Sequence, residues 1–112
     1  MTIFERIAAG DIPARIVYQD EEVLAFHDVN PQAPVHILVV PKRVIPRIGA
    51  AADTDADLLG RLLLTARNIA ATEGIDHGGY RLVINHGPDG GETVPHLHIH
   101  LLGGRPLGWP PG

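Results

Sequence analysis

The sequence predicts an α+β fold in which a five-stranded antiparallel sheet carries one long helix and a short N-terminal helix. Two observations lead to this prediction. Short apolar segments with β-strand alternation recur between clusters of turn residues. One longer segment, residues 53–73, instead has apolar residues at helical spacing. A chain of 112 residues suits one domain with a single core, so we expect residues 1–112 to fold as a unit.

Composition and charge argue against several classes of protein. The chain has no cysteine, which excludes disulfides and thiolate metal sites. A formal net charge of −4 argues against a nucleic-acid partner, because such partners need a basic surface. The first residues lack the basic start and apolar run of a signal peptide, and no apolar segment reaches membrane-spanning length. We therefore expect a cytoplasmic protein without a membrane partner.

The first predicted elements are a short helix and a hairpin. Thr2 and Glu5 have the spacing of a capping box, in which each side chain satisfies a free amide at a helix start. Gly10 ends this helix. Residues 15–18 and 23–27 are separated by a polar turn, which predicts two antiparallel strands.

The centre of the sheet and its covering helix follow. Residues 36–40 are nearly all apolar and rich in β-branched side chains, which is typical of a central strand buried on both faces. Acidic residues at the start of helix 53–73 complement the positive end of its dipole. The apolar residues that we expect to face the sheet form one stripe: Leu59, Leu62, Leu63, Ala66, Ile69 and Ala70.

Two strands and a tail complete the chain. Residues 80–85 and 96–102 are predicted as the fourth and fifth strands. Residues 103–112 are rich in glycine and proline, and we expect them to form an irregular C-terminal tail.

The fifth strand carries the residues best suited to chemistry. Successive side chains of a strand point to opposite faces, so His96, His98 and His100 share one face while the intervening aliphatic residues face the core. Histidines seldom cluster without a metal or a reaction, although a solvated, His-rich strand face is the alternative. A neutral imidazole is a good nucleophile near pH 7, and a second histidine can carry a proton to a leaving group.

The loop at residues 85–95 leads directly into these histidines. It is rich in glycine, which lets a backbone approach a ligand closely, and successive amides in such a loop can bind an anion. Asn85 and Thr93 add an amide and a hydroxyl that suit phosphate oxygens. A glycine-rich loop is more often a plain turn, so only its position favours a phosphate site. Loop and histidines together suggest chemistry at a phosphorus or acyl centre.

Residues 96–102, His-Leu-His-Ile-His-Leu-Leu, resemble the His-x-His-x-His signature of the histidine-triad family. The resemblance covers almost the whole chain. Several further segments resemble the Hint-like branch of that family: residues 26–36, 40–42, 90–91, 102–105 and the Trp-Pro-Pro-Gly ending at 109–112.

The resemblance implies a HIT-like fold and a nucleotide-binding hydrolase. Such an enzyme cleaves the P–N bond of nucleoside 5′-phosphoramidates of the AMP-amine type and releases AMP and an amine. The substrate would be a purine nucleotide, as a conjugate of AMP or GMP, and no metal or cofactor would be required. Thr93 and Pro95 stand where many members carry other residues, which leaves the preferred leaving group open.

The same resemblance implies a homodimer whose sheet continues into the partner. Helix 53–73 and strand 80–85 would meet their copies across the axis. Leu58 and Leu64 lie off the predicted stripe of the helix and add apolar surface for a partner. Trp109, in the proline-stiffened tail, would reach the partner subunit's site.

Catalytic roles are implied residue by residue. His98 would be the nucleophile, forming a covalent nucleotidyl-histidine intermediate that water then hydrolyses. The other catalytic residues would be His36, His96 and His100, of which His36 and His96 orient and polarise the rest.

The resemblance also implies how the nucleotide is held. Asp28 would accept hydrogen bonds from the ribose hydroxyls. The phosphate would contact His98 and the other residues expected around it: His100, Asn85, Thr93 and the backbone of Gly91 and Glu92. The base would occupy an apolar slot: Phe4, Ile12, Phe26, Val29 and Leu38. No role is assigned to His77 or His86, and His27 suits a structural role as well as a functional one.

Two other functions remain open. A dinucleoside polyphosphate hydrolase of the same superfamily would cleave P–O bonds, although the ending at 109–112 favours a phosphoramidase. The other alternative is a non-catalytic module that binds zinc or a protein partner. Against zinc, three alternating histidines spread over about 13 Å at roughly 3.3 Å per residue, too far for one ion.

Overall fold

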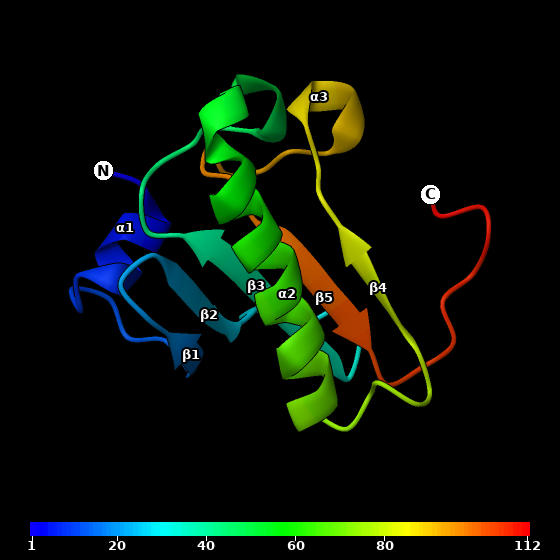
Figure 1. Cartoon of the computed structure of the whole chain (residues 1–112). Coiled ribbons are helices and arrows are strands. Elements are labelled where there is room, and N and C mark those ends of the chain that lie inside the picture. The colour runs from blue at the N-terminus through cyan, green and yellow to red at the C-terminus, as the bar shows by residue number, and fades with distance from the viewer.

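The computed structural model describes residues 1–112 and contains one five-stranded antiparallel sheet (Figure 1). Its strand order is β1-β2-β3-β5-β4, so β3 lies at the centre, as predicted, and β1 and β4 are the edges. The strands are β1 (Ile16–Gln19), β2 (Val23–His27), β3 (Val35–Pro41), β4 (Tyr80–Val83) and β5 (Ile99–Gly103). The predicted fold class is confirmed.

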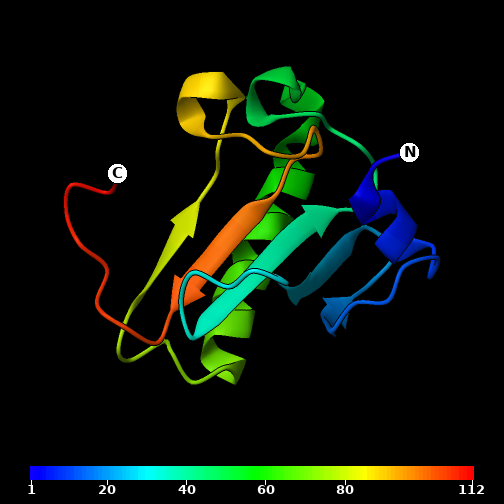
Figure 2. The same cartoon turned by 180° about the vertical axis from the view of Figure 1, so that it is seen from behind.

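The two faces of the sheet are covered differently. Helix α2 (Ala56–Thr72) crosses one face over β3 and β5 (Figure 1). Helix α1 (Ile3–Ala8) lies at one end of the opposite face, most of which stays open in the view from behind (Figure 2). No helix is both long enough and apolar enough to span a membrane.

The capping box predicted for α1 is present. The Thr2 hydroxyl accepts a hydrogen bond from the Glu5 amide at 3.1 Å, and the Glu5 carboxylate accepts one from the Thr2 amide at 2.8 Å. Phe4 and Ile7 of α1 are buried against apolar side chains of β2 and β3. The cap therefore fixes where α1 starts, and these two side chains fix which face it covers.

The buried stripe of α2 differs from the predicted one. Leu58 is buried in the core, whereas Leu63 is 45% exposed and Leu59 is only partly buried. Leu64 is 50% exposed, as expected. Apolar residues at spacings of three and four form a stripe that contains either Leu58 or Leu59, so the sequence does not decide between them. Packing against β3 and β5 buries the stripe that contains Leu58. The helix also starts later than residue 53, because residues Asp53–Asp55 form a separate 3₁₀ turn.

The chain around β5 differs from the prediction at both ends. His96 lies in a bend and His98 in an extended segment before the strand, which begins at Ile99. Gly103 ends the strand, paired with Val35 and Tyr80, so the irregular tail starts one residue later than predicted. The predicted alternation still holds, since Leu97, Ile99 and Leu101 all lie in the core beneath α2.

The fourth strand is shorter than predicted, and its following loop contains a helical turn. β4 ends at Val83, and residues Gly87–Gly90 form a short helix, α3. Gly91 follows with φ +78°, a left-handed conformation that favours glycine. The loop at residues 85–95 is thus more ordered than a plain glycine-rich turn.

Candidate active site

The site lies on the open face of the sheet, where the strand register aligns three side chains. Phe26 of β2 is opposite Leu38 of β3, and Leu38 is opposite His100 of β5. Residues directly opposite in antiparallel strands project to the same face. This row leads from an apolar region beside α1 to a histidine beside the loop at residues 85–95.

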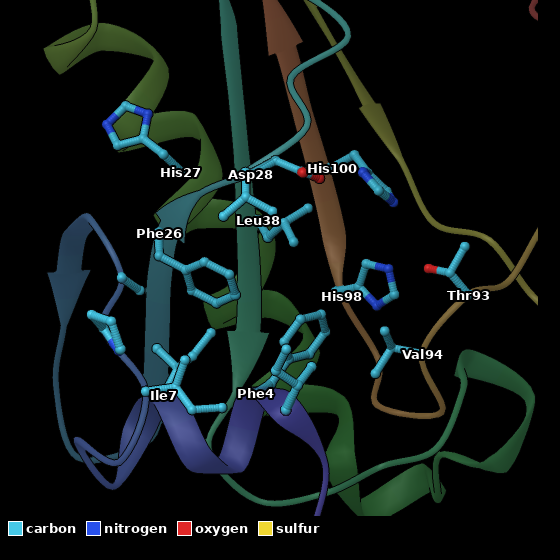
Figure 3. A pocket seen from close by; sticks show the side chains of 15 residues that line it. Phe4, Ile7, Phe26, His27, Asp28, Leu38, Thr93, Val94, His98 and His100 are labelled. Carbon is cyan, nitrogen blue, oxygen red and sulfur yellow. The ribbon is translucent and has the colours of Figure 1, made fainter.

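A cavity of about 260 Å³ opens above this row. In Figure 3, Phe26 and Ile7 lie on one side of it, and the Thr93 hydroxyl points towards His98 on the other. The lining contains nine predicted site residues: Phe4, Ile12, Phe26, Asp28, Val29, Leu38, Thr93, His98 and His100. It also contains residues for which no site role was predicted: Ile3, Ile7, Pro13, Ala14, His27 and Val94.

One chain of hydrogen bonds determines which nitrogen of His98 is free. His98 Nδ1 lies 2.7 Å from the carbonyl oxygen of His96 and must donate to it, which leaves the lone pair on Nε2. The His96 ring is held in turn, since its Nε2 donates to the Pro41 carbonyl at 2.7 Å. His96 Nδ1 accepts from the Thr2 hydroxyl at 2.7 Å. His98 therefore directs a nucleophilic nitrogen away from its backbone.

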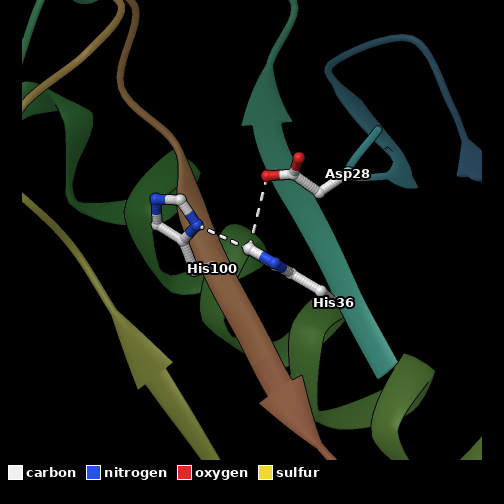
Figure 4. A group of neighbouring side chains, drawn as sticks. All are labelled: Asp28, His36 and His100. Carbon is white, nitrogen blue, oxygen red and sulfur yellow. Dashed lines mark hydrogen bonds and ion pairs between the residues drawn. The ribbon is translucent and has the colours of Figure 1, made fainter. Parts of the chain in front are cut away.

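A second chain determines the protons of His36 and His100 (Figure 4). The Gln32 amide donates to His36 Nδ1 at 3.0 Å, so a neutral His36 carries its proton on Nε2. That Nε2 donates to His100 Nδ1 at 2.9 Å and lies 3.4 Å from the Asp28 carboxylate. The proton of neutral His100 is then on Nε2, which is buried without a partner. An unpaired buried donor in this position suits an oxygen of a bound ligand.

Burial favours the uncharged form of His36, His96 and His100. Desolvation lowers the pKa of His36, and also that of His96. The pKa of His100 falls to about 4, through burial first and then repulsion from His98 and His36, while Asp28 opposes the shift. Neutral rings at neutral pH are what both hydrogen-bond chains require.

Some predicted site residues lie outside the cavity lining. His36 and His96 contact the lining histidines instead, as described above. Asn85 and Gly91 are not among the lining residues, and the Glu92 carboxylate pairs with Arg47. Trp109 is 83% exposed on the tail, which runs beside β4 on the far side of the sheet from α1 (Figure 2).

A family model described as the HIT domain matches residues 9–107 of this sequence. The chain belongs to the HIT domain family. It is 57% identical over 111 residues to an uncharacterized HIT-like protein of Synechocystis sp., covering 99% of this chain and 96% of that one. It is 50% identical over 113 residues to a 14 kDa zinc-binding protein of Brassica juncea, covering 99% of each. The structure resembles a HIT family hydrolase from Legionella pneumophila with a TM-score of 0.98, 47% identity and complete coverage of both chains.

Two contacts of this HIT domain could not have been found from sequence spacing. Thr2 reaches His96 across 94 residues of sequence, and nothing in the capping-box pattern points to that second role. Arg47 reaches Glu92 across 45 residues. Ile3 and Ile7, in contrast, share a face of α1 with Phe4, and the spacing of three and four residues could have revealed them.

One group of side chains in the HIT site could hold a metal ion. A carboxylate oxygen of Asp28 and one ring nitrogen each of His36 and His100 lie within 4.8 Å of one another. Oxygen and imidazole ligands suit zinc, although an ion there would displace the hydrogen bond between the two rings. The predicted objection to zinc applied to His96, His98 and His100, and this group is a different one.

We expect NMR to find His100 neutral, with its proton on Nε2, until the pH falls towards 4. The reason is that its Nδ1 accepts from His36 and its ring is desolvated. Ring ¹⁵N shifts measured between pH 3.5 and 8 would report both properties. A His100 ring that becomes charged near the ordinary histidine pKa of 6.5, or carries its proton on Nδ1, would contradict the assignment.

Proposed function

We propose that this HIT protein is a nucleoside phosphoramidase that cleaves the P–N bond of purine nucleotide conjugates such as AMP-amines. The observation that carries the proposal is the proton arrangement of two neighbouring histidines that line the cavity, with ring centres 4.9 Å apart. Nε2 of His98 offers a lone pair, and Nε2 of His100 offers a proton with no partner inside the protein. A nucleophile beside an unpaired donor suits attack on a phosphorus whose oxygens gain negative charge.

In the first step, His98 Nε2 attacks the α-phosphorus and the P–N bond breaks. The His98 ring becomes positively charged in the adduct, and its Nδ1–H remains hydrogen-bonded to the His96 carbonyl. His100 donates to a phosphoryl oxygen, with help from the Thr93 hydroxyl, Asn85 and the backbone of Gly91 and Glu92. The departing amine takes up one proton from solvent, which His100 and His36 beside Asp28 can relay, so that both rings end the step neutral. In the second step water attacks the phosphorus, the bond between phosphorus and His98 Nε2 breaks, and AMP leaves. The proton that water loses returns to solvent and balances the one taken up by the amine.

The nucleoside would fill the remainder of the cavity. One oxygen of Asp28 already accepts from the Asn30 amide at 2.8 Å, which fixes the carboxylate at the cavity edge. Its remaining lone pairs can accept from the two ribose hydroxyls. The base would pack in the apolar slot of Phe4, Ile12, Phe26, Val29 and Leu38, with His27 at its edge.

A second candidate function is zinc binding. The group Asp28, His36 and His100 has suitable ligand atoms, and the Brassica juncea relative is named a zinc-binding protein. Zinc bound there would occupy His36 Nε2 and His100 Nδ1, the atoms that now form the ring-to-ring hydrogen bond. Metal binding would therefore compete with the proton arrangement on which the hydrolase proposal depends.

We also propose that the protein is a homodimer whose sheet continues through β4. β4 is an edge strand with one side unpaired, and Ile84 next to it is 39% exposed. Leu63 and Leu64 of α2 are exposed nearby, and Leu63 and Ile84 both line an apolar hollow of about 160 Å³. A second copy would cover these side chains, and Trp109 of its tail would reach the site. Residues 1–112 act as one domain in this proposal, and the reaction takes place in the cytoplasm.

Replacing His98 by Asn or Gly should lower turnover of an AMP-amine by more than about 10³-fold while AMP still binds, because only the nucleophile is lost. A fluorogenic AMP-amine assay and calorimetry with AMP would measure the two effects. His77→Ala, at a fully exposed side chain, is the matched control. Residual activity within tenfold of wild type would overturn the assignment of His98.

The same assay separates the alternatives. A dinucleoside polyphosphate hydrolase would prefer diadenosine polyphosphate to the AMP-amine. A zinc-binding module would show no turnover and would retain about one zinc per chain after purification without a His tag.

Deleting residues 107–112 should leave a folded dimer but change kcat/KM selectively for substrates with bulky amine leaving groups. Arg81 donates to the Gly108 carbonyl at 2.7 Å and so holds the tail beside β4, and in the proposed dimer the residues beyond Gly108 contact the leaving group in the partner's site. Sedimentation at micromolar concentration and kinetics with small and bulky amines would measure both properties. A wild-type monomer would refute the dimer, and an unchanged leaving-group preference would refute the role of the tail.

A further inference from the structure

We propose that Arg47 is a positioning residue for the phosphate loop, defined here as residues 87–93, and that it acts through the Glu92 carboxylate. The inference rests on the proposed function, since it concerns how that loop is held for a phosphate. Arg47 donates to both carboxylate oxygens of Glu92, through Nε and through a terminal nitrogen, each at 2.8 Å. Two parallel bonds fix the orientation of the carboxylate as well as its distance.

Glu92 closes the phosphate loop on itself. Its carboxylate accepts from the Gly87 amide at 3.0 Å, and its own amide donates to the Gly87 carbonyl at 3.1 Å. The two ends of the turn that contains α3 are thereby joined through one residue. Thr93, whose hydroxyl points into the cavity, is the next residue along the chain (Figure 3). A displacement of Glu92 would therefore displace Thr93 and the neighbouring amides.

The segment that carries Arg47 is itself attached to the histidines. The Ile45 carbonyl accepts from the Leu97 amide at 2.6 Å, and the Pro41 carbonyl accepts from the His96 ring. Residues 41–47 therefore contact the two residues that precede His98 and, through Arg47, the phosphate loop. The residues that precede His98 and the phosphate loop are therefore held by the same segment.

A second contact ties the start of the phosphate loop to the same region. The Gly49 amide donates to His86 Nδ1 at 3.2 Å, and a Cβ at Gly49 would overlap the His86 ring. His86, for which no role was predicted, thus packs against the backbone two residues beyond Arg47.

The positive charge of Arg47 is neutralised by the Glu92 carboxylate. We therefore expect Arg47 to act by positioning the loop and not by attracting the phosphate directly. The Glu92 side chain is only 13% exposed, and hydrogen bonds from Arg47 and Gly87 lower its pKa to about 2. The pair therefore stays ionised at any pH at which the neutral histidines can work. A lysine at this position would keep the charge but lose the two-pronged geometry.

The test compares Arg47→Ala and Arg47→Lys in the full chain, with calorimetry for AMP and for adenosine, which lacks the phosphate. We expect both variants to bind AMP about tenfold more weakly, as for other residues that orient a contacting group, and adenosine within twofold of wild type. The double variant Arg47→Ala/Glu92→Gln should bind AMP as tightly as Arg47→Ala alone, because both variants lose the same Arg47–Glu92 interaction. Arg43→Ala is the matched control, since Arg43 lies in the same segment but pairs with Asp55.

Hydrogen exchange of the free protein supplies a readout that does not depend on the proposed function. The amides of residues 87–93 should exchange faster in Arg47→Ala than in wild type or Arg43→Ala. Arg47→Lys binding AMP like wild type would assign the effect to charge, and equal weakening of AMP and adenosine would assign it to general loosening. Either result, or unchanged exchange, would overturn the inference. A wild-type protein that binds adenosine but not AMP would overturn the proposed function instead, and the exchange data would still decide the role of Arg47.

Discussion

The hydrogen bond from His98 Nδ1 to the His96 carbonyl is the interaction on which the chemistry of the site depends. It leaves Nε2 as the only position for a lone pair on a neutral ring. The carbonyl can serve this purpose because the His96 ring is fixed between the Pro41 carbonyl and the Thr2 hydroxyl. The N-terminal cap, the end of β3 and the segment before β5 thus meet at one buried ring, and a change in any of them would affect His98, the proposed nucleophile.

Burial of the His100 ring lowers the stability of the fold but favours the protonation state that the proposed function needs. A buried donor without a partner, such as Nε2 of His100, costs a protein roughly 1–3 kcal/mol. The same desolvation lowers the pKa of His100 to about 4, so the neutral ring accepts from His36 at Nδ1 and carries its one proton on Nε2. A ligand oxygen at that position would recover the lost hydrogen bond, and in the proposed function a phosphate supplies that oxygen.

Much of the fold follows from local patterns, because those patterns report neighbours along the chain. The capping box at Thr2 and the hairpin of β1 and β2 needed only spacing, and so did the alternation that places the aliphatic neighbours of the histidines in the core. The rotation of α2 that buries Leu58 needed the shape of the sheet. The contacts of Thr2 with His96 and of Arg47 with Glu92 join distant segments, and no periodicity encodes them.

The most direct test of this account is to locate the covalent intermediate. His100→Ala protein, in which turnover should be slowed, would be mixed with an AMP-amine, quenched without acid, digested and analysed by mass spectrometry. The account predicts one adenylylated peptide, containing His98, whose modification disappears in acid and is absent when His98 is also replaced by Asn. Turnover with no adduct on any histidine, or an adduct on His96 or His36, would contradict it.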